Sequence, residues 1–139
     1  MFKKIVVYIC FSLLVLSCER IFINGELDGM WRLERVESES GITYPKDVFY
    51  SFQRHLVMMG IYSETVHPKN YYMGCFSYDG NNIVMNNFYR YPGMDGVCVP
   101  EELENLYIYD TTVNFKVEKI SSDILVLSSC DVKYTFRKW

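Results

Sequence analysis

The chain has 139 residues, of which 50% are hydrophobic and 17% aromatic, and 14 lysines and arginines against 17 acidic residues give a net charge of −3. This length suits one domain with one sizeable core. The acidic balance and the lack of any basic run argue against nucleic acid or an anionic lipid surface as the main partner.

The first 17 residues have the layout of a removable export signal. Lys3 and Lys4 make a basic start, residues 5–16 are almost wholly apolar, and the small residue Ser17 precedes Cys18. The apolar run is too short to span a bilayer as a permanent helix. Composition alone leaves open an ordinary secretory signal cleaved near Ser17, or a short apolar anchor.

The segment Leu14-Val15-Leu16-Ser17-Cys18 resembles the lipobox of bacterial lipoproteins, in which the cysteine becomes the acylated first residue. The resemblance implies a lipidated Cys18 and a palmitate-type, covalent membrane attachment, because a diacylglyceryl group plus an acyl chain binds far more firmly than one chain. Loss of residues 1–17 from the 139 would leave 122, with a net charge of −5. The expected location is the bacterial cell envelope, on the outer membrane, facing the periplasm or the exterior.

Residues 18–27 would then form a tether to a domain that spans residues 28–139. Fully extended, these ten residues reach at most roughly 33 Å, so the domain would sit close to one leaflet. The tether contains four large apolar residues: Ile21, Phe22, Ile23 and Leu27. We expect them to pack under one end of the domain; the alternative is that they dip into the lipid.

The first predicted strand covers residues 29–36 and opens at Gly29-Met30-Trp31-Arg32-Leu33. Trp31 and Leu33 share one face, because successive side chains of a strand alternate. Residues 37–41 are a polar break that ends in glycine, a typical turn residue.

Four further strands are predicted between residues 48 and 88. A period of two along residues 48–53 indicates one buried face. Residues 55–62 are apolar on both faces, so periodicity does not show their inward side, but a glycine and β-branched residues favour a strand over a helix. Residues 71–78 and 83–88 flank Asp79-Gly80, which is typical of a tight hairpin turn.

Residues 89–99 are the longest irregular segment, and the only helical pattern follows them. A proline starts residues 100–107, acidic residues lie near the positive end of this helix, and Leu103, Leu106 and Tyr107 recur at helical spacing. We expect this segment to cover one end of the fold.

The last thirty residues show the clearest alternation. Residues 113–117, 124–128 and 132–136 predict three strands with polar outer faces and tight links, which form an antiparallel meander. In the last of them, inward Tyr134 and Phe136 alternate with polar residues that include Arg137. Counted from Trp31, the chain has eight strands and one short helix.

Three thiols remain if Cys10 leaves with the signal and Cys18 carries lipid: Cys75, Cys98 and Cys130. In an oxidising compartment, one disulfide and one free thiol are expected. Cys75 with Cys98 is the first candidate pair, and three unpaired, buried cysteines are an equal alternative. No C-x-x-C spacing occurs and there are only two histidines, so we expect no zinc site and no cofactor.

The whole pattern resembles the lipocalin-like domain of small bacterial lipoproteins, part of the calycin group. The resemblance rests on Gly29-x-Trp31, on residues 71–78 with their Asp79-Gly80 turn, and on the Tyr-Thr-Phe-Arg-Lys ending at residues 134–138. It implies an all-β fold, an eight-stranded antiparallel up-and-down barrel whose closure removes exposed edges, with one short helix before the sixth strand.

In that family the tryptophan closes one end of the barrel beneath an arginine of the last strand. The resemblance therefore implies that Gly29, Trp31 and Arg137 form a barrel seal, with a cation–π contact of about 0.5–2 kcal/mol between Arg137 and the indole. The chain is shorter than full-length lipocalins and has its helix before the sixth strand instead of after the eighth. Both departures argue against a roomy ligand cavity.

A barrel of eight strands is just wide enough to be filled by side chains or to hold one small ligand. The candidate ligand-binding residues are large and mostly aromatic: Tyr50, Phe52, Met59, Tyr72, Phe76, Phe115, Tyr134 and Phe136. They either fill the interior, which is the commoner role, or line an apolar pocket in which tyrosine hydroxyls orient the ligand.

No catalytic motif is present: the sequence lacks G-x-S-x-G, a phosphate-binding glycine-rich loop before a helix, and H-E-x-x-H. We therefore expect a binding protein and no enzyme. The resemblance favours a lipid-anchored carrier of a small apolar molecule in the barrel mouth. The alternative is a filled barrel that acts as a protein-interaction module at the envelope, anchored by exposed aromatic residues such as Tyr89, Tyr91, Tyr107 and Tyr109.

Overall fold

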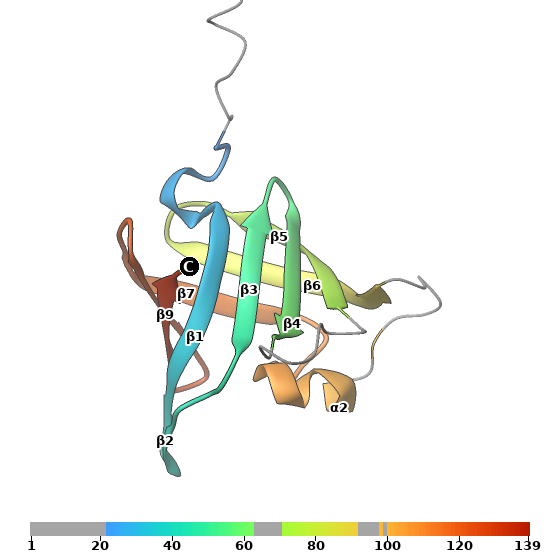
Figure 1. The fold of residues 1–139 in the computed structure, drawn as a ribbon, viewed down its shortest axis with the longest axis vertical. Helices are drawn as coiled ribbons and strands as arrows, with labels where there is room; N and C mark the ends of the chain where they lie inside the picture. The colour runs from blue at the N-terminus through green and yellow to red at the C-terminus, as the bar shows by residue number, and fades with distance from the viewer. Residues whose placement is uncertain (1–21, 63–70, 92–97, 99) are drawn as a thin grey trace, which may run out of the picture.

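A computed structural model describes residues 22–62, 71–91, 98 and 100–139. Nine antiparallel strands form one sheet in the order β2-β1-β3-β4-β5-β6-β7-β8-β9, and β1 also pairs with β9. This last pairing closes the sheet into a ring, which confirms the predicted all-β up-and-down barrel (Figure 1). The strands are β1 (Gly29–Ser38), β2 (Gly41–Thr43), β3 (Val48–Gln53), β4 (Leu56–Ile61), β5 (Tyr71–Tyr78), β6 (Asn82–Tyr91), β7 (Val113–Ile120), β8 (Ile124–Ser129) and β9 (Val132–Lys138).

Short helical segments lie at the two ends of the barrel. The 3-10 turn η2 (Gly25–Leu27) precedes β1, and α2 (Pro100–Leu103) continues into the 3-10 turn η3 (Glu104–Leu106) before β7. We call the end at η2 the closed end and the opposite end, where α2 lies, the mouth (Figure 1). No helix among the described residues has the length and apolar character needed to cross a membrane.

The sequence predicted eight strands, and the ninth is β2. It pairs with the end of β1 through Val36↔Thr43 and Ser38↔Gly41, so β1 runs two residues beyond its predicted end. All three residues of β2 are exposed, so this strand has no apolar alternation that a pattern could detect. Because β2 adds one strand, the helix precedes the seventh strand instead of the sixth.

Strand register settles the inward side of β4, which periodicity left open. Tyr50 of β3 faces Met59 of β4, and Phe52 faces Val57. Since Tyr50 and Phe52 point into the barrel, their partners Val57 and Met59 do too, and both are fully buried. The inward side of residues 55–62 is therefore determined by their pairing with β3 and not by their own sequence pattern.

The predicted hairpin at Asp79-Gly80 is confirmed. β5 pairs with β6 from Tyr78↔Ile83 onward, and Gly80 has a φ of +94° that other residues rarely adopt. The Asp79 carboxylate accepts hydrogen bonds from the backbone N–H groups of Asn81 (2.8 Å) and Asn82 (2.7 Å). These bonds fix the turn and lower the pKa of Asp79.

Irregularities in three strands help the sheet to curl. The register shifts between Leu33 and Arg35 in β1, between Met73 and Cys75 in β5, and between Val117 and Lys119 in β7. Such bulges increase local twist, which a small closed barrel needs. The β5 shift centres on Gly74, where a Cβ atom would lie only 2.7 Å from a ring carbon of Phe88.

Candidate functional site

All eight candidate lining residues belong to the interior of the barrel. Seven of them are at most 5% exposed, and Tyr72 is half-buried against the same cluster. Their rings meet inside the barrel, with centroids 5.1 Å apart for Tyr50–Phe136, 5.1 Å for Phe52–Phe76 and 5.2 Å for Phe115–Tyr134. Apart from Met59, whose inward side follows from the register of β4 with β3, these side chains were placed on the correct face by alternation. Their contact with a ligand stays a prediction.

The segment that covers the mouth takes part in the same core. We call residues 100–108 the cap. Leu103 and Ile108 of the cap are fully buried and Leu106 is 1% exposed, so three apolar side chains enter the barrel from its end. The sequence pattern indicated Leu103 and Leu106 but missed Ile108, which lies just beyond the helical spacing.

A left-handed residue turns the cap back toward the barrel. Tyr107 has a φ of +63°, and its N–H donates to the carbonyl of Glu104 at 2.9 Å. The N–H of Ile108 then donates to the carbonyl of Leu103 at 3.2 Å. This reversal directs Ile108 inward and leaves the carbonyl groups of Leu106 and Tyr107 facing the interior tyrosines.

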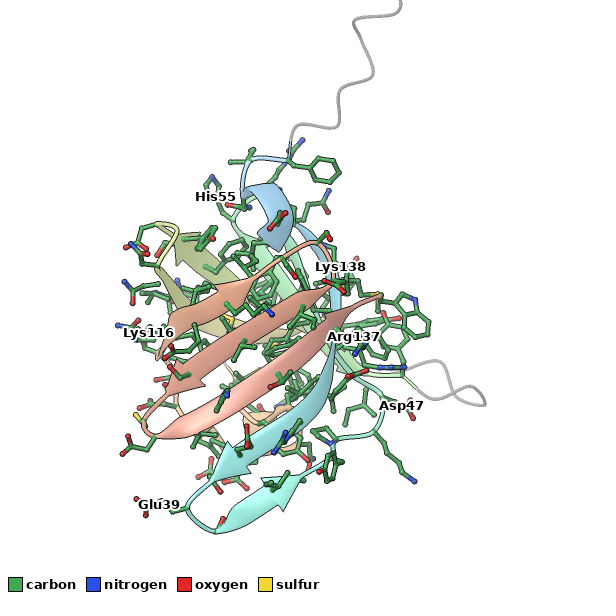
Figure 2. All side chains as sticks on the ribbon, turned by 90° about the vertical axis from the view of Figure 1, so that its left-hand side faces the viewer. Glu39, Asp47, His55, Lys116, Arg137 and Lys138 are labelled. Atoms are coloured by element: carbon green, nitrogen blue, oxygen red, sulfur yellow. The ribbon has the colours of Figure 1, made fainter. Side chains whose placement is uncertain are left out.

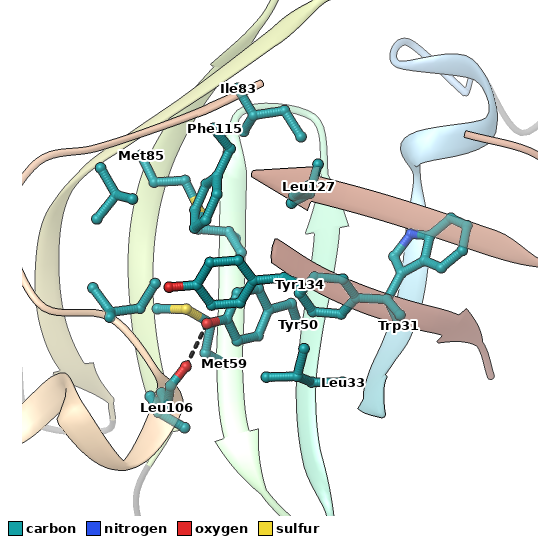
Figure 3. Close-up of a cluster of buried hydrophobic side chains, with 14 of the residues drawn as sticks. Trp31, Leu33, Tyr50, Met59, Ile83, Met85, Leu106, Phe115, Leu127 and Tyr134 are labelled. Carbon is teal, nitrogen blue, oxygen red and sulfur yellow. Dashed lines mark hydrogen bonds between the residues drawn. The ribbon is translucent and has the colours of Figure 1, made fainter. Parts of the chain in front are cut away.

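Two interior tyrosines hold the cap in place. The Tyr50 hydroxyl donates a hydrogen bond to the carbonyl oxygen of Leu106 (Figure 3). The Tyr134 hydroxyl donates to the carbonyl oxygen of Tyr107 at 3.1 Å. Burial raises the pKa of Tyr50 well above its ordinary value and raises the pKa of Tyr134 as well, so both hydroxyls remain neutral donors. The groups expected to orient a ligand are therefore bonded to the protein's own backbone.

Trp31 closes the other end of the barrel. Its side chain is 0% exposed, and its indole N–H donates to the carbonyl of Leu27 at 2.9 Å. Leu27, itself fully buried, brings η2 beneath the indole. The predicted position of Trp31 at the base of the barrel is thus confirmed.

The cation over Trp31 is Lys138. Its Nζ lies 4.3 Å from the ring centroid and donates to the carbonyls of Glu26 (2.9 Å) and Asp28 (2.5 Å). Gly29 makes room for it, since a Cβ atom there would lie 2.8 Å from Cε of Lys138. Desolvation lowers the pKa of Lys138.

The assignment of Arg137 to this seal is therefore wrong. Arg137 lies on the outer face, where its Nε is 3.4 Å from a carboxylate oxygen of Glu34. Arg32 binds the same carboxylate at 2.7 Å, and the two arginines, of which Arg137 is labelled in Figure 2, lower the pKa of Glu34. The alternation along β9 explains the placement, because inward Tyr134 and Phe136 require residue 137 to point outward and residue 138 inward.

Replacing Lys138 with methionine is expected to lower the free energy of unfolding by about 0.5–2 kcal/mol, the usual range of a cation–π contact. Arg137→Met is the matched control, and we expect a smaller effect because exposed ion pairs contribute little. Urea denaturation followed by circular dichroism measures both. An equal or larger loss for Arg137→Met would contradict the placement of Lys138 over the indole.

The three described cysteines, Cys75, Cys98 and Cys130, are all free thiols. The predicted Cys75–Cys98 disulfide is thus absent. The alternative of three unpaired, buried cysteines holds for the pairing, but only Cys98 is buried, while Cys130 is exposed. Cys98 belongs to the buried core, whereas Cys75 is half-exposed on a strand whose neighbouring residues Gly74 and Phe76 point inward. The two thiols therefore lie on opposite faces of the sheet. No group of three His, Cys, Asp or Glu side chains in the described part of the chain is placed to hold a metal ion.

The surface near the mouth is hollowed and partly aromatic. An open groove of about 1220 Å³ lies beside the cap and along β7–β9, lined among others by Tyr107, Tyr109, Val132 and Tyr134. Of the four tyrosines predicted as exposed anchors, Tyr109 and Tyr91 are exposed, while Tyr89 and Tyr107 are half-buried. A second hollow of about 510 Å³ lies on the outer face of β1 beside the connection to β3.

Comparisons with known proteins agree with this geometry. A family model described as a lipocalin-like domain matches residues 11–139. A lipocalin-like protein from Bacteroides uniformis is 24% identical with a TM-score of 0.62, over 83% of this chain and 100% of that one. An uncharacterized protein from Bacteroides eggerthii is 19% identical with a TM-score of 0.65, over 81% and 99% of the two chains. No curated protein matches the sequence.

Proposed function

This chain belongs to the lipocalin-like domain family, and from that membership we propose that it is a lipid-anchored protein of the bacterial cell envelope that binds a small apolar molecule at the barrel mouth. Lipocalin-like barrels can enclose one small ligand. Residues 1–21, with Cys18, lie outside the described residues, so the anchor rests on the sequence pattern. The proposal concerns binding, not catalysis.

The cap is the observation that supports a site at the mouth. It presents three apolar side chains to the interior and two carbonyl oxygens to the hydroxyls of Tyr50 and Tyr134. A small apolar molecule with an acceptor oxygen offers the same contacts, so it can replace the cap without leaving those hydroxyls unpaired. Withdrawal of the three branched side chains clears roughly 300 Å³, the lower end of ligand-pocket volumes.

On its outer side the cap is joined to the barrel by an ion pair between Glu102 and Arg90. Ion pairs at the surface contribute little to stability. The groove of about 1220 Å³ adjoins the cap at Tyr107 and also reaches Tyr134 of β9, whose hydroxyl bonds to the cap. A ligand therefore has an open approach to the side chains that hold the cap.

Shortening a cap side chain is expected to strengthen ligand binding. Leu106→Ala removes apolar contacts of the cap and should raise the affinity for a fluorescent fatty-acid probe several-fold, measured by titration with the chain from Glu19 onward. Leu125→Ala is the matched control, because Leu125 is equally buried but pairs with Phe136 near the closed end. Near-UV circular dichroism confirms that both variants stay folded. No binding by any form, or equal gains in both variants, would argue against a site at the mouth.

The natural ligand is sought by purifying the chain from Glu19 onward from its native host. Extraction into organic solvent should yield a reproducible small molecule. An empty extract, together with no change of tryptophan fluorescence with any apolar probe, would favour the interaction module instead.

The anchor has its own test. Cys18→Ala is expected to abolish incorporation of labelled palmitate and to release the protein from the membrane fraction, because no other cysteine follows a signal-like segment. Cys130→Ala, which changes an exposed thiol far along the chain, should leave labelling intact. Persistent labelling of Cys18→Ala would overturn the lipid anchor.

A second function has specific support on the outer surface. Trp139 is 72% exposed, its ring lies 5.3 Å from that of Phe49, and the Arg32 guanidinium lies 5.6 Å from its centroid. Tryptophan and arginine together are typical of the centres of protein interfaces. A filled barrel could bind a partner protein through this face while its interior stays closed.

A further inference from the structure

The apolar residues that precede the barrel fall into two groups. Leu27 is fully buried beneath Trp31, which confirms for this residue the expected packing under one end of the domain. Phe22 and Ile23, only a few residues earlier, are 59% and 55% exposed, so for them that expectation is wrong. Two large apolar side chains in sequence thus point away from the domain at its closed end.

Hydrogen bonds hold this exposed pair in place. The N–H of Gly25 donates to the carbonyl of Phe22 at 3.2 Å. The Asn24 side chain donates to the Asp28 carboxylate at 2.7 Å and to the carbonyl of Arg54 at 2.9 Å. The segment is therefore bonded to Asp28, directly before β1, and to the turn between β3 and β4. Phe22 and Ile23 are thus presented by a fixed turn.

A third exposed apolar residue lies at the same end. Leu56, two residues beyond Arg54, is 41% exposed at the start of β4. Figure 2 places His55, in the same turn, beside the N-terminal segment at the end of the molecule. We call Phe22, Ile23 and Leu56 the apolar tip.

We propose that the apolar tip inserts into the lipid layer that holds the acyl chains, so that the barrel stands on the membrane by its closed end with the mouth facing away. The inference rests on the proposed acylation of Cys18. Cys18 precedes Phe22 by four residues, so the acylated residue lies at most roughly 14 Å from the tip. Apolar side chains of membrane-surface proteins reach about 5–10 Å into the boundary between headgroups and acyl chains, which suits this distance.

Insertion of the apolar tip does not depend on anionic lipid. The three side chains of the tip are uncharged, and the residues around them carry both signs, with Glu26 in η2 and Arg54 in the adjoining turn. Zwitterionic phosphatidylcholine is therefore expected to be sufficient. This orientation also leaves the cap and its groove open to the aqueous phase.

The test uses the acylated full chain in phosphatidylcholine vesicles, some of them containing brominated lipid. Phe22→Trp places a reporter in the tip, and Tyr109→Trp, at an exposed position at the mouth, is the matched control. Both variants also carry Trp139→Phe, so that the only other tryptophan is buried Trp31, whose fluorescence is the same in both. The Phe22→Trp emission should shift to shorter wavelength and be quenched by brominated lipid, whereas the Tyr109→Trp emission should change in neither respect.

A double variant measures the contribution of the tip to membrane residence. Phe22→Ser with Ile23→Ser, with Cys18 intact, should speed transfer of the acylated protein between vesicles by roughly tenfold or more. Palmitate labelling and flotation come first, since absence of label would overturn the anchor and this inference with it. If the protein is labelled and floats with the vesicles, but brominated lipid does not quench the Phe22→Trp emission, the anchor stands and only the insertion of the tip is overturned.

Discussion

Trp31→Ala is expected to lower the free energy of unfolding by about 3–5 kcal/mol, the usual cost of deleting a large buried ring. The indole is 0% exposed and donates its N–H to the carbonyl of Leu27. The substitution therefore opens a cavity at the closed end, leaves that carbonyl without its partner, and removes the surface on which Lys138 lies. Chemical denaturation followed by far-UV circular dichroism measures the loss.

Trp139→Ala is the matched control for this substitution. Trp139 is 72% exposed and contacts Phe49 on the outer face of the barrel. Its removal is expected to cost less than about 1 kcal/mol, since little apolar surface leaves water on that side. A loss below about 1 kcal/mol for Trp31→Ala would show that the indole does not close the barrel.

Gly74→Ala is expected to lower the free energy of unfolding by about 1–3 kcal/mol, the usual cost of overpacking a core. The new Cβ would lie 2.7 Å and 2.8 Å from two ring carbons of Phe88 and 3.1 Å from the carbonyl oxygen of Asn86. Phe88 is 1% exposed in the core, so its ring has no room to withdraw. Thermal and urea unfolding both report the change.

Gly60→Ala provides the comparison on the adjacent strand. Its Cβ would lie 3.3 Å from a ring carbon of Tyr71, a half-buried side chain on the outer face that can shift. We expect Gly60→Ala to lower the free energy of unfolding by less than about 0.5 kcal/mol. Phe88→Leu should recover part of the loss in Gly74→Ala by removing the clash, and equal losses for the two glycines would contradict the packing described for β5.

Strands with one polar face were predictable from the sequence alone. Alternation located β1, β7 and β9, because their buried residues recur at or near every second position. In β3 and β8 three consecutive residues are buried, so there the apolar run as a whole indicated the strand. The features that the sequence pattern missed or left open depend on pairing with a neighbouring strand. The inward side of β4 follows from its register with β3, and β2 exists only through backbone pairing with β1.

The seal shows where the family analogy was less reliable than the chain's own pattern. The family resemblance pointed to Arg137, although alternation along residues 132–137 already placed that side chain outside. Lys138 takes the inward position, where Gly29 leaves room for it. The state of Cys75 and Cys98 depends on which face of the sheet each occupies, and nothing in their spacing encodes that.

The contact between tyrosine hydroxyls and the cap could not be predicted at all. Tyr50 and Leu106 are 56 residues apart in the sequence, and Tyr134 reaches a carbonyl group that is accessible only because Tyr107 is left-handed. The sequence identified both tyrosines as interior residues. Their hydrogen-bond partners are backbone carbonyl groups, which every residue has, so no residue type in the sequence points to them.

The pairing of β1 with β9 has a consequence for how the protein forms. Lys138 bonds to the carbonyl of Asp28, 110 residues earlier in the sequence. The ring therefore closes only after the last strand has formed and paired with the first. Contacts of such long range slow folding, since the entropy of a very large loop must be lost before they form. A nascent chain thus keeps one edge of β1 open until synthesis reaches β9.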